Sequence, residues 1–124
     1  MAREQVEITK PQISFGDFER VDMRVAEVLS AKEAVGARIP SRVFELDLGP
    51  LGKRQSVGQY ALLAEDYLVG KKVVVCCNLG VRQMGKYVSE VLLMGVPHPD
   101  SIEGQHQAFP LMTDLHSTNG DRVF

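Results

Sequence analysis

The residues best suited to chemistry lie in a short basic stretch, residues 78–93. Arg82 and Lys86 supply cations that could contact phosphate, Ser89 supplies a hydroxyl donor, and Tyr87 supplies an exposed ring that could stack on a base. Apolar runs flank the stretch, so we expect it to connect two buried strands. These residues predict a loop that binds nucleic acid. Taken alone, the loop is also compatible with a solvated hairpin whose charges contact only water.

The distribution of charge favours a local basic surface. The chain has 124 residues and a formal net charge of −2, which disfavours a protein that binds every polyanion. Residues 36–59 nevertheless carry four basic and two acidic groups, and residues 71–90 carry four and one. If the fold brings these blocks together, they form a basic face suited to a structured nucleic acid. Chance clustering of so few charges is the alternative.

Sequence motifs give no support for catalysis. Residues 49–53 resemble a phosphate-binding loop only superficially, because that motif requires glycine at the position of Asp47 and serine or threonine at that of Arg54. The three histidines are eight and ten residues apart and lack the close pairing of zinc ligands. We therefore predict no enzyme activity, no cofactor and no metal.

Alternation of apolar and polar residues predicts three strands in the first half of the chain. Residues 21–25 alternate with a period of two, and the rhythm breaks over residues 26–29 as it would at a β-bulge in a long strand. Residues 43–48 alternate in the same way. A turn containing two glycines and a proline then leads to residues 53–57, which completes a hairpin.

One helix and two more strands are predicted in the second half. Apolar residues recur at spacings of three and four from Tyr60 to Leu68, and Gly70 ends the pattern. Residues 73–77 are apolar on both faces, and residues 91–94 form a further apolar run. Three strands, a helix and two strands is the order of the all-β, five-stranded OB-fold barrel. Another small β-barrel would share much of this pattern.

Several segments resemble the CsaA family, a branch of the tRNA-binding domains that also occur at the C-terminus of some methionyl-tRNA synthetases. The resemblance extends from residue 15 to at least residue 95. It is carried by residues 17–25, 37–40, 46–49, 55–59, 78–79 and 89–95. It implies an OB fold, a homodimer built with help from the segment after the barrel, tRNA binding, and a proposed chaperone role in protein export.

The resemblance points to Arg82 and Ser89 as RNA-binding residues, with Arg38 and Arg42 as basic partners. Lys86, the second cation of the loop, completes the predicted RNA-binding set. Arginine offers a planar, permanently charged set of donors for phosphate or a base, and serine could add a neutral hydrogen bond. Many relatives carry a second basic residue after the loop arginine and a glycine directly before the aromatic residue. Here a glutamine takes the first position and the glycine stands one place earlier. The cation has shifted within the loop and is still present.

Two other charged residues near this set are expected to have structural roles. Arg24 lies between Asp22 and Glu27 and is expected to pair with a carboxylate. Glu90 is expected to orient a neighbouring backbone group or arginine, although it could also accept a hydrogen bond from a base edge.

The alternative function is an export-related chaperone that binds unfolded polypeptide in an apolar groove of the dimer. Val81, Met84, Tyr87 and Val88 lie in or beside the basic loop. The flexible thioether of methionine suits a surface that accepts varied side chains. Met84 and Val88 could instead turn inward to cap the barrel, or contribute to a dimer contact.

Length and composition predict one domain. With 44% hydrophobic residues, the chain can form a single core and is too short for two. We expect an N-terminal tail over residues 1–12 and a tRNA-binding OB-fold domain over residues 13–124. Its last part, about residues 96–124, is expected to be a dimerisation extension that covers the barrel or a partner subunit.

Apolar run lengths and the cysteines favour the cytoplasm. No run approaches the length of a membrane span, and the start of the chain carries charges where a signal peptide would be apolar. We therefore expect no membrane insertion. Cys76 and Cys77 are adjacent, so on a strand they point to opposite faces and cannot easily bridge each other. Reduced cysteines are typical of a reducing compartment.

Overall fold

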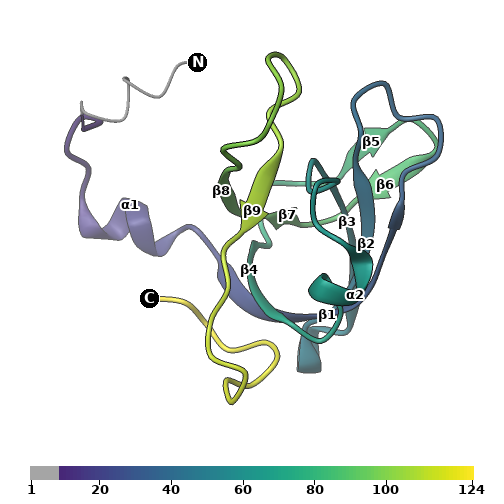
Figure 1. The fold of residues 1–124 in the computed structure, drawn as a ribbon. Coiled ribbons are helices and arrows are strands. Elements are labelled where there is room, and N and C mark those ends of the chain that lie inside the picture. Colours follow the sequence, from purple (N-terminus) through teal and green to yellow (C-terminus); the bar gives the residue numbers. More distant parts are fainter. Residues whose placement is uncertain (1–8) are drawn as a thin grey trace.

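A curled, five-stranded antiparallel sheet dominates the computed structural model, which describes residues 9–124 (Figure 1). The strand order is β3-β2-β1-β4-β7. The strands are β1 Met23–Glu33, β2 Arg42–Asp47, β3 Lys53–Gly58, β4 Lys72–Cys76 and β7 Leu92–Leu93. The predicted all-β fold, a five-stranded OB-type barrel, is confirmed.

Hydrogen bonds between the two edges of this sheet close it into a barrel. The amide of Leu93, in β7, donates to Oγ of Ser56, in β3, over 3.4 Å. The hydroxyl of Tyr60, just after β3, donates to the carbonyl of Leu93 over 2.7 Å. The Tyr60 ring also meets Phe44 edge to face, with ring centroids 5.6 Å apart. Tyr60 therefore joins the barrel seam to the core.

The core follows the period of two that the sequence predicts. In β2 and the residue after it, Phe44, Leu46 and Leu48 are fully buried, while the intervening Glu45 and Asp47 are not. Side chains from other elements complete the same cluster, namely Ala26, Val28, Ala31, Tyr60, Leu68, Val73, Val75, Val91 and Leu93. Burial of this apolar surface is the main stabilising contribution to the fold.

A β-bulge lies where the sequence predicts one. The β1–β2 register pairs Val28 with Leu46 and Ser30 with Glu45, so one residue of β1 is left over between these two pairs. The bulge increases the local bend of the strand. β1 can thus pair with β4 through residues 23–27 and with β2 through residues 27–33.

The predicted helix over residues 60–68 is shorter in the structure. Helix α2 spans Glu65–Leu68, and Leu68 is its buried residue. Residues 61–63 form turns, and the chain is extended at Ala64, with ψ 148°. The carbonyl of Leu63, which the amide of Tyr67 would bind in a continuous helix, accepts from Nε of Arg42 instead. Gly70 ends the element with φ +87°, as predicted.

Two hairpins extend the barrel. The basic stretch forms β5 Arg82–Met84 and β6 Tyr87–Ser89, joined by a two-residue turn in which Gly85 has φ +63°. After β7, strand β8 Gly95–Pro97 pairs with β9 Ala108–Pro110. Of the predicted final strand over residues 91–94, only Leu92–Leu93 form β7, and β8 begins after it at Gly95. A 3₁₀ turn, η2 Gly49–Leu51, lies in the predicted turn between β2 and β3.

The C-terminal extension packs on its own barrel. The amide of Val74 donates to the carbonyl of Leu111, and the amide of Val25 donates to that of Asp121. Gly120 has φ +93°, and a Cβ there would lie 2.5 Å from the carbonyl oxygen of Leu48. Only glycine allows this close approach of the extension to the barrel.

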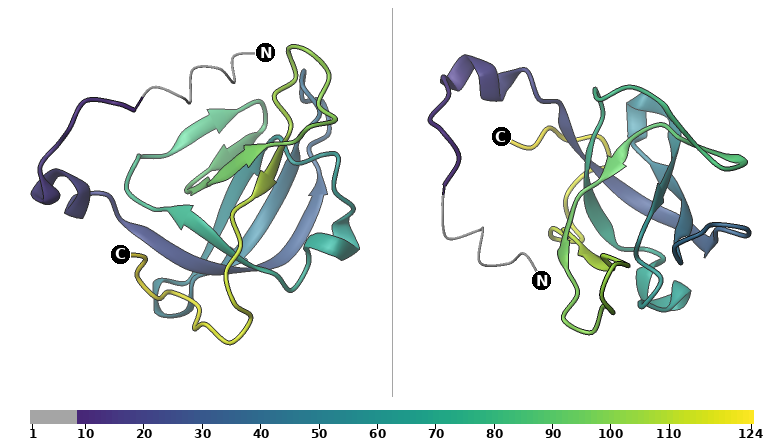
Figure 2. Two further views of the ribbon diagram at one scale, coloured as in Figure 1. Left: turned by 60° about the vertical axis from the view of Figure 1, so that its left-hand side comes forward. Right: turned by 90° about the horizontal axis from the view of Figure 1, so that it is seen from above.

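The N-terminal segment includes a helix that the sequence did not predict. Helix α1, Phe15–Glu19, begins after Ser14, whose Oγ accepts a hydrogen bond from the amide of Asp17 over 3.0 Å. It has no buried residue and stands away from the barrel (Figure 2). Of the predicted tail, residues 9–12 have no regular structure, and residues 1–8 lie outside the described residues.

Candidate nucleic-acid interface

A groove of about 730 Å³ lies between the loop joining β1 to β2, residues 34–41, and the β5–β6 hairpin. These two segments are distant in sequence, and the groove exists because the barrel brings both to one end (Figure 1). The groove is lined by Ala34, Val35, Gly36, Ala37, Arg38, Ile39, Ser41, Val57, Gln59, Arg82, Gln83, Met84, Gly85, Lys86 and Tyr87. The loops after the first and fourth barrel strands are where OB folds bind oligonucleotides.

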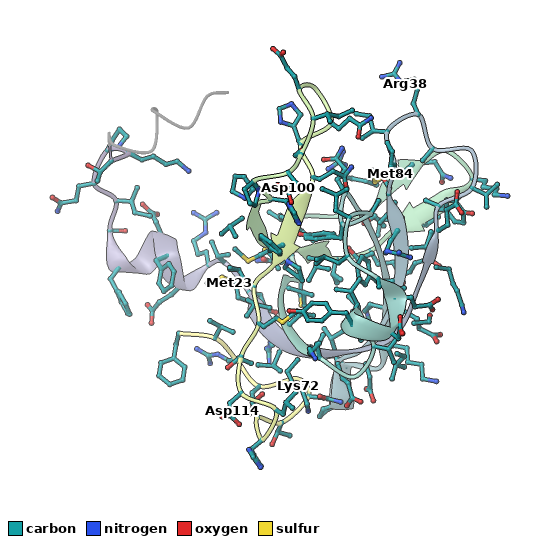
Figure 3. All side chains as sticks on the ribbon, in the orientation of Figure 1. Met23, Arg38, Lys72, Met84, Asp100 and Asp114 are labelled. Carbon is teal, nitrogen blue, oxygen red and sulfur yellow. The ribbon has the colours of Figure 1, made fainter. Side chains whose placement is uncertain are left out.

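Three of the five predicted RNA-binding residues line this groove. Arg38 comes from the β1–β2 loop, and Arg82 and Lys86 come from the hairpin. All three are exposed, and Figure 3 shows Arg38 at the outer tip of its loop, above Met84 on the hairpin. Within the described part of the chain, no carboxylate is among the lining residues. The groove is therefore a local basic surface on a protein with a net charge of −2.

Tyr87 joins the two walls of the groove. Its hydroxyl accepts a hydrogen bond from the amide of Val35 over 3.1 Å, and Nζ of Lys86 lies 5.5 Å from its ring centroid. The prediction that Tyr87 is exposed was wrong, because the ring is half-buried by these contacts across the groove. The ring fixes the hairpin against the loop and leaves only part of its surface for a ligand.

Arg42 lies beside the groove and is held by main-chain carbonyls. Its Nε donates to Leu63 over 3.0 Å and its Nη1 donates to Ala31 over 2.8 Å. The guanidinium borders a neighbouring hollow of about 360 Å³ that shares the base of the β1–β2 loop with the groove. Arg42 therefore adds positive charge near the groove while it ties together β1, β2 and the turn before α2.

Ser89 is not brought to the groove. It is buried, and its hydroxyl accepts from the amide of Val57 over 3.1 Å and donates to the carbonyl of Val91 over 3.3 Å. It pairs with Arg82 across the hairpin, but its side chain is used to attach β6 to β3. The contact with RNA that the family resemblance implied for Ser89 has no geometric support here.

The predicted polypeptide-binding residues are divided between two places. Met84 and Tyr87 line the groove, whereas Val81 and Val88 are exposed and lie outside its lining. Further apolar groups from other elements enter the groove, and the sequence did not suggest them: Val35, Ile39 and Val57. Ile39 and Val57 lie in segments 37–40 and 55–59, which carry the family resemblance, whereas the only signal for Val35 was its position before them in the chain.

The polar side chains around the hairpin stiffen it. Nε2 of Gln83 donates to the carbonyls of Gly85 and Tyr87, over 2.7 and 3.2 Å. The carboxylate of Glu90 accepts from the amide of Gln55 over 2.8 Å, which agrees with the structural role expected for it. Away from the groove, Nε of Arg24 pairs with Asp22 at 2.7 Å, also as expected.

The perturbed titratable groups belong to the fold and not to the groove. Burial raises the pKa of the Tyr60 hydroxyl to about 12 and that of the Cys77 thiol to about 11. A hydrogen bond from Lys32 lowers the pKa of the Glu65 carboxyl, and the backbone amide of His116 lowers that of Asp114. None of these four residues lines the groove.

Residues 9–124 lack two other kinds of site. No group of three or more histidine, cysteine, aspartate and glutamate side chains there could hold a metal ion. No helix in the same residues is long and apolar enough to cross a membrane.

Comparison with known proteins gives concordant matches. Residues 23–122 match the family described as "Putative tRNA binding domain". The chain is 41% identical over 93 residues to the methionine–tRNA ligase of Lactococcus lactis, a match that covers 73% of this chain and 14% of the ligase. The chain thus spans about a seventh of the length of that relative.

Solved structures match nearly the whole chain. Chaperone CsaA from Bacillus anthracis is 27% identical with a TM-score of 0.79, over 92% of this chain and 100% of CsaA. CsaA from Picrophilus torridus is 24% identical with a TM-score of 0.81, over 91% of this chain and 100% of CsaA. Because its sequence identity is only 24%, the match to the Picrophilus torridus protein is evidence for the fold alone.

Proposed function

This chain belongs to the tRNA-binding domain family, and from that premise we propose that it binds tRNA without catalysis, through the groove between the β1–β2 loop and the β5–β6 hairpin. One observation carries the proposal: Arg38, Arg82 and Lys86 come from two separate segments and line one groove that no carboxylate lines among the described residues. Converging cations are what a phosphate backbone requires.

The proposed mechanism is phosphate positioning combined with recognition of shape. The guanidinium groups of Arg38 and Arg82 can each grip a phosphate with two parallel hydrogen bonds, while Lys86 acts as a point charge. Arg42 contributes charge at the border of the groove, and Ser89 makes no contact with RNA in this proposal. Folded RNA is recognised largely by its geometry and 2′-hydroxyls, so binding depends on where these cations stand.

The experiment is equilibrium binding of total tRNA across a salt series. Arg82→Ala should weaken binding by about fivefold at low salt and reduce the slope of log K against log salt by about one unit, because one phosphate contact is lost. Arg20→Ala is the matched control, since Arg20 is an exposed arginine outside the groove whose surface pair with Asp17 is weak. Equal effects of the two substitutions, or binding that does not respond to salt, would contradict the proposal.

We also propose that the protein is a homodimer, which would present two such grooves at a fixed distance. Supporting this, a hollow of about 270 Å³ lies between α1 and the C-terminal residues, and apolar side chains around it are exposed. Phe15 is 71% exposed and Phe124 is 99% exposed, which is costly for a monomer in water. A second copy meeting the same surface would bury both through a symmetric contact.

Sedimentation velocity tests the dimer. The wild type should sediment as a dimer at micromolar concentration, and the double substitution Phe15→Ser, Phe124→Ser should shift it to the monomer. Tyr67→Ser, at an exposed position on α2, is the control and should leave the dimer intact. A monomeric wild type would overturn this part of the proposal.

A second candidate function is the binding of unfolded polypeptide in the same groove. Met84, Tyr87, Val35 and Ile39 give it an apolar lining beside the cations, and the similar structure from Bacillus anthracis is that of a chaperone. Binding of apolar side chains would respond little to salt. The salt series therefore separates the two functions.

We place this activity in the cytoplasm. Both cysteines, Cys76 and Cys77, are free, which suits a reducing compartment.

A further inference from the structure

Gln107, in the C-terminal extension, is a buried polar side chain with partners in two other parts of the chain. It is 1% exposed. Its Oε1 accepts from the amide of Ala61 over 2.8 Å, and its Nε2 donates to the carbonyl of Pro40 over 2.8 Å. A backbone amide can only donate and a carbonyl can only accept, so these partners fix the orientation of the side-chain amide.

The main chain of Gln107 is fixed as well. Its amide donates to Oγ of Ser101 over 2.8 Å, and its carbonyl accepts from the amide of His98 over 2.9 Å. The next amide, that of Ala108, donates to the carbonyl of Gln59 over 2.8 Å. The side chain of Gln107 thus projects from a segment that has little freedom to move.

The partner Pro40 lies in the loop that carries Arg38. That loop is closed on itself by a hydrogen bond from the amide of Ala34 to the carbonyl of Ser41 over 3.0 Å. Tyr87 holds its first half through Val35, and Gln107 holds its second half through Pro40. Arg38 stands between these two attachments.

We propose that Gln107 is a positioning residue for RNA binding, which fixes the β1–β2 loop so that Arg38 faces the groove. This inference rests on the proposed tRNA function of that groove. It gives the C-terminal extension a role in the binding site of its own chain, in addition to covering the barrel. Because the loop that carries Arg38 is held before the ligand arrives, less conformational entropy of its backbone is lost on binding.

The test compares Gln107→Met with Ser56→Ala. Methionine has a similar length and keeps the packing but removes both side-chain hydrogen bonds. Ser56 is also 1% exposed and accepts one buried hydrogen bond, yet it lies in β3 outside the lining of the groove. Both variants are expected to be less stable than the wild type, so the control separates loss of stability from loss of loop position.

Two measurements are made below the unfolding temperature of every variant: the rate of trypsin cleavage after Arg38, located by mass spectrometry, and the affinity for total tRNA. In Gln107→Met the cleavage rate should rise and the affinity should fall, each by about tenfold, since a buried hydrogen bond that holds the loop is lost. In Ser56→Ala both should stay within about twofold of the wild type. If Gln107→Met does not fold, Gln107→Asn carries the same test, because the shorter side chain cannot span both partners.

The outcomes distinguish this inference from the proposed function. Equal cleavage rates after Arg38 in the Gln107 variant and in Ser56→Ala would overturn the positioning role. The wild type could fail to bind tRNA while cleavage is faster only in the Gln107 variant. That result would support the attachment of the loop by Gln107 and refute the tRNA function. Faster cleavage with unchanged tRNA affinity would overturn the role of Gln107 in RNA binding.

Discussion

The hydroxyl of Tyr87 and the amide of Val35 lie 3.1 Å apart and join the two walls of the groove. Val35 precedes Arg38 in the β1–β2 loop, and Tyr87 follows Lys86 in the hairpin. The bond therefore sets the spacing between cations that come from different parts of the sequence. The width of the groove therefore depends on this hydrogen bond as well as on the barrel strands that carry the two walls.

Tyr87→Phe removes this hydrogen bond and keeps the ring. The pair lies near the surface, so we expect the free energy of unfolding to fall by only about 0.5–1 kcal/mol. Affinity for tRNA should fall by about two- to fivefold, because the walls are no longer held at one spacing. Amide hydrogen exchange checks the local effect, since the Val35 amide should exchange faster. Tyr67→Phe, which alters an exposed tyrosine on α2, is the control and should change none of these. Unchanged exchange at Val35 in Tyr87→Phe would exclude the link.

Arg42→Met separates a structural arginine from a binding one. The substitution removes the hydrogen bonds to Ala31 and Leu63, and we expect it to lower the free energy of unfolding by about 1–3 kcal/mol. The loss of tRNA affinity should be smaller than for Arg82→Ala. Lys32→Met is the control on the neighbouring strand, since the exposed pair of Lys32 with Glu65 contributes little to stability. Unfolding in urea measures the stabilities. Unchanged stability together with an affinity loss equal to that of Arg82→Ala would make Arg42 a direct ligand.

The strands were predictable because the sheet has one buried face. In β2, alternate burial of Phe44, Leu46 and Leu48 repeats the period of two in the sequence. The resemblance to the CsaA family added the connection between the strand order and a tRNA-binding barrel, and it is confirmed. The alternation is local in sequence and the resemblance is carried by short segments, so both can be recognised from the sequence alone.

The groove could be predicted only in part because its walls are distant in sequence. Arg82 and Lys86 lie four residues apart and were visible together, but Val35, Ile39 and Gln59 enter only after folding. A residue's side of a strand also escapes prediction in a three-residue strand. The sequence therefore could not show that Ser89 contacts β3 or that Tyr87 contacts the loop on the other side of the groove.

The helix before β4 shows how tertiary contacts override local pattern. Apolar spacing alone predicts a helix from Tyr60, yet Arg42, 21 residues earlier, takes the carbonyl of Leu63 that a continuous helix would need. A partner so distant in sequence leaves no local signal.

Tyr60→Phe should make stability less sensitive to alkaline pH. The folded pKa of Tyr60 is raised to about 12 from the ordinary 10.0, so the folded state favours the protonated hydroxyl. Its contribution is complete below pH 10 and is lost as the pH rises toward 12, and it amounts to about 2.7 kcal/mol at most, since each pKa unit corresponds to about 1.36 kcal/mol. At pH 7 the variant should be about 1–2 kcal/mol less stable, because the carbonyl of Leu93 loses its partner. Urea unfolding at pH 7 and pH 11 measures the stability at pH 7 and its dependence on pH. If the wild type and the variant lose stability in parallel above pH 10, the raised pKa of Tyr60 is contradicted.

Competition between tRNA and an unfolded polypeptide tests whether one groove serves both ligands. Met84 and the three cations line the same groove, so a fluorescent apolar peptide without net charge should be displaced by tRNA at low salt. Met84→Ser should weaken the peptide by about three- to tenfold, since it removes a buried apolar contact. It should leave the salt slope for tRNA unchanged, because no charge is altered. Val81→Ser is the matched control: Val81 is 68% exposed and outside the groove lining, and its replacement should affect neither ligand. Simultaneous binding of peptide and tRNA would place the polypeptide site elsewhere on the barrel.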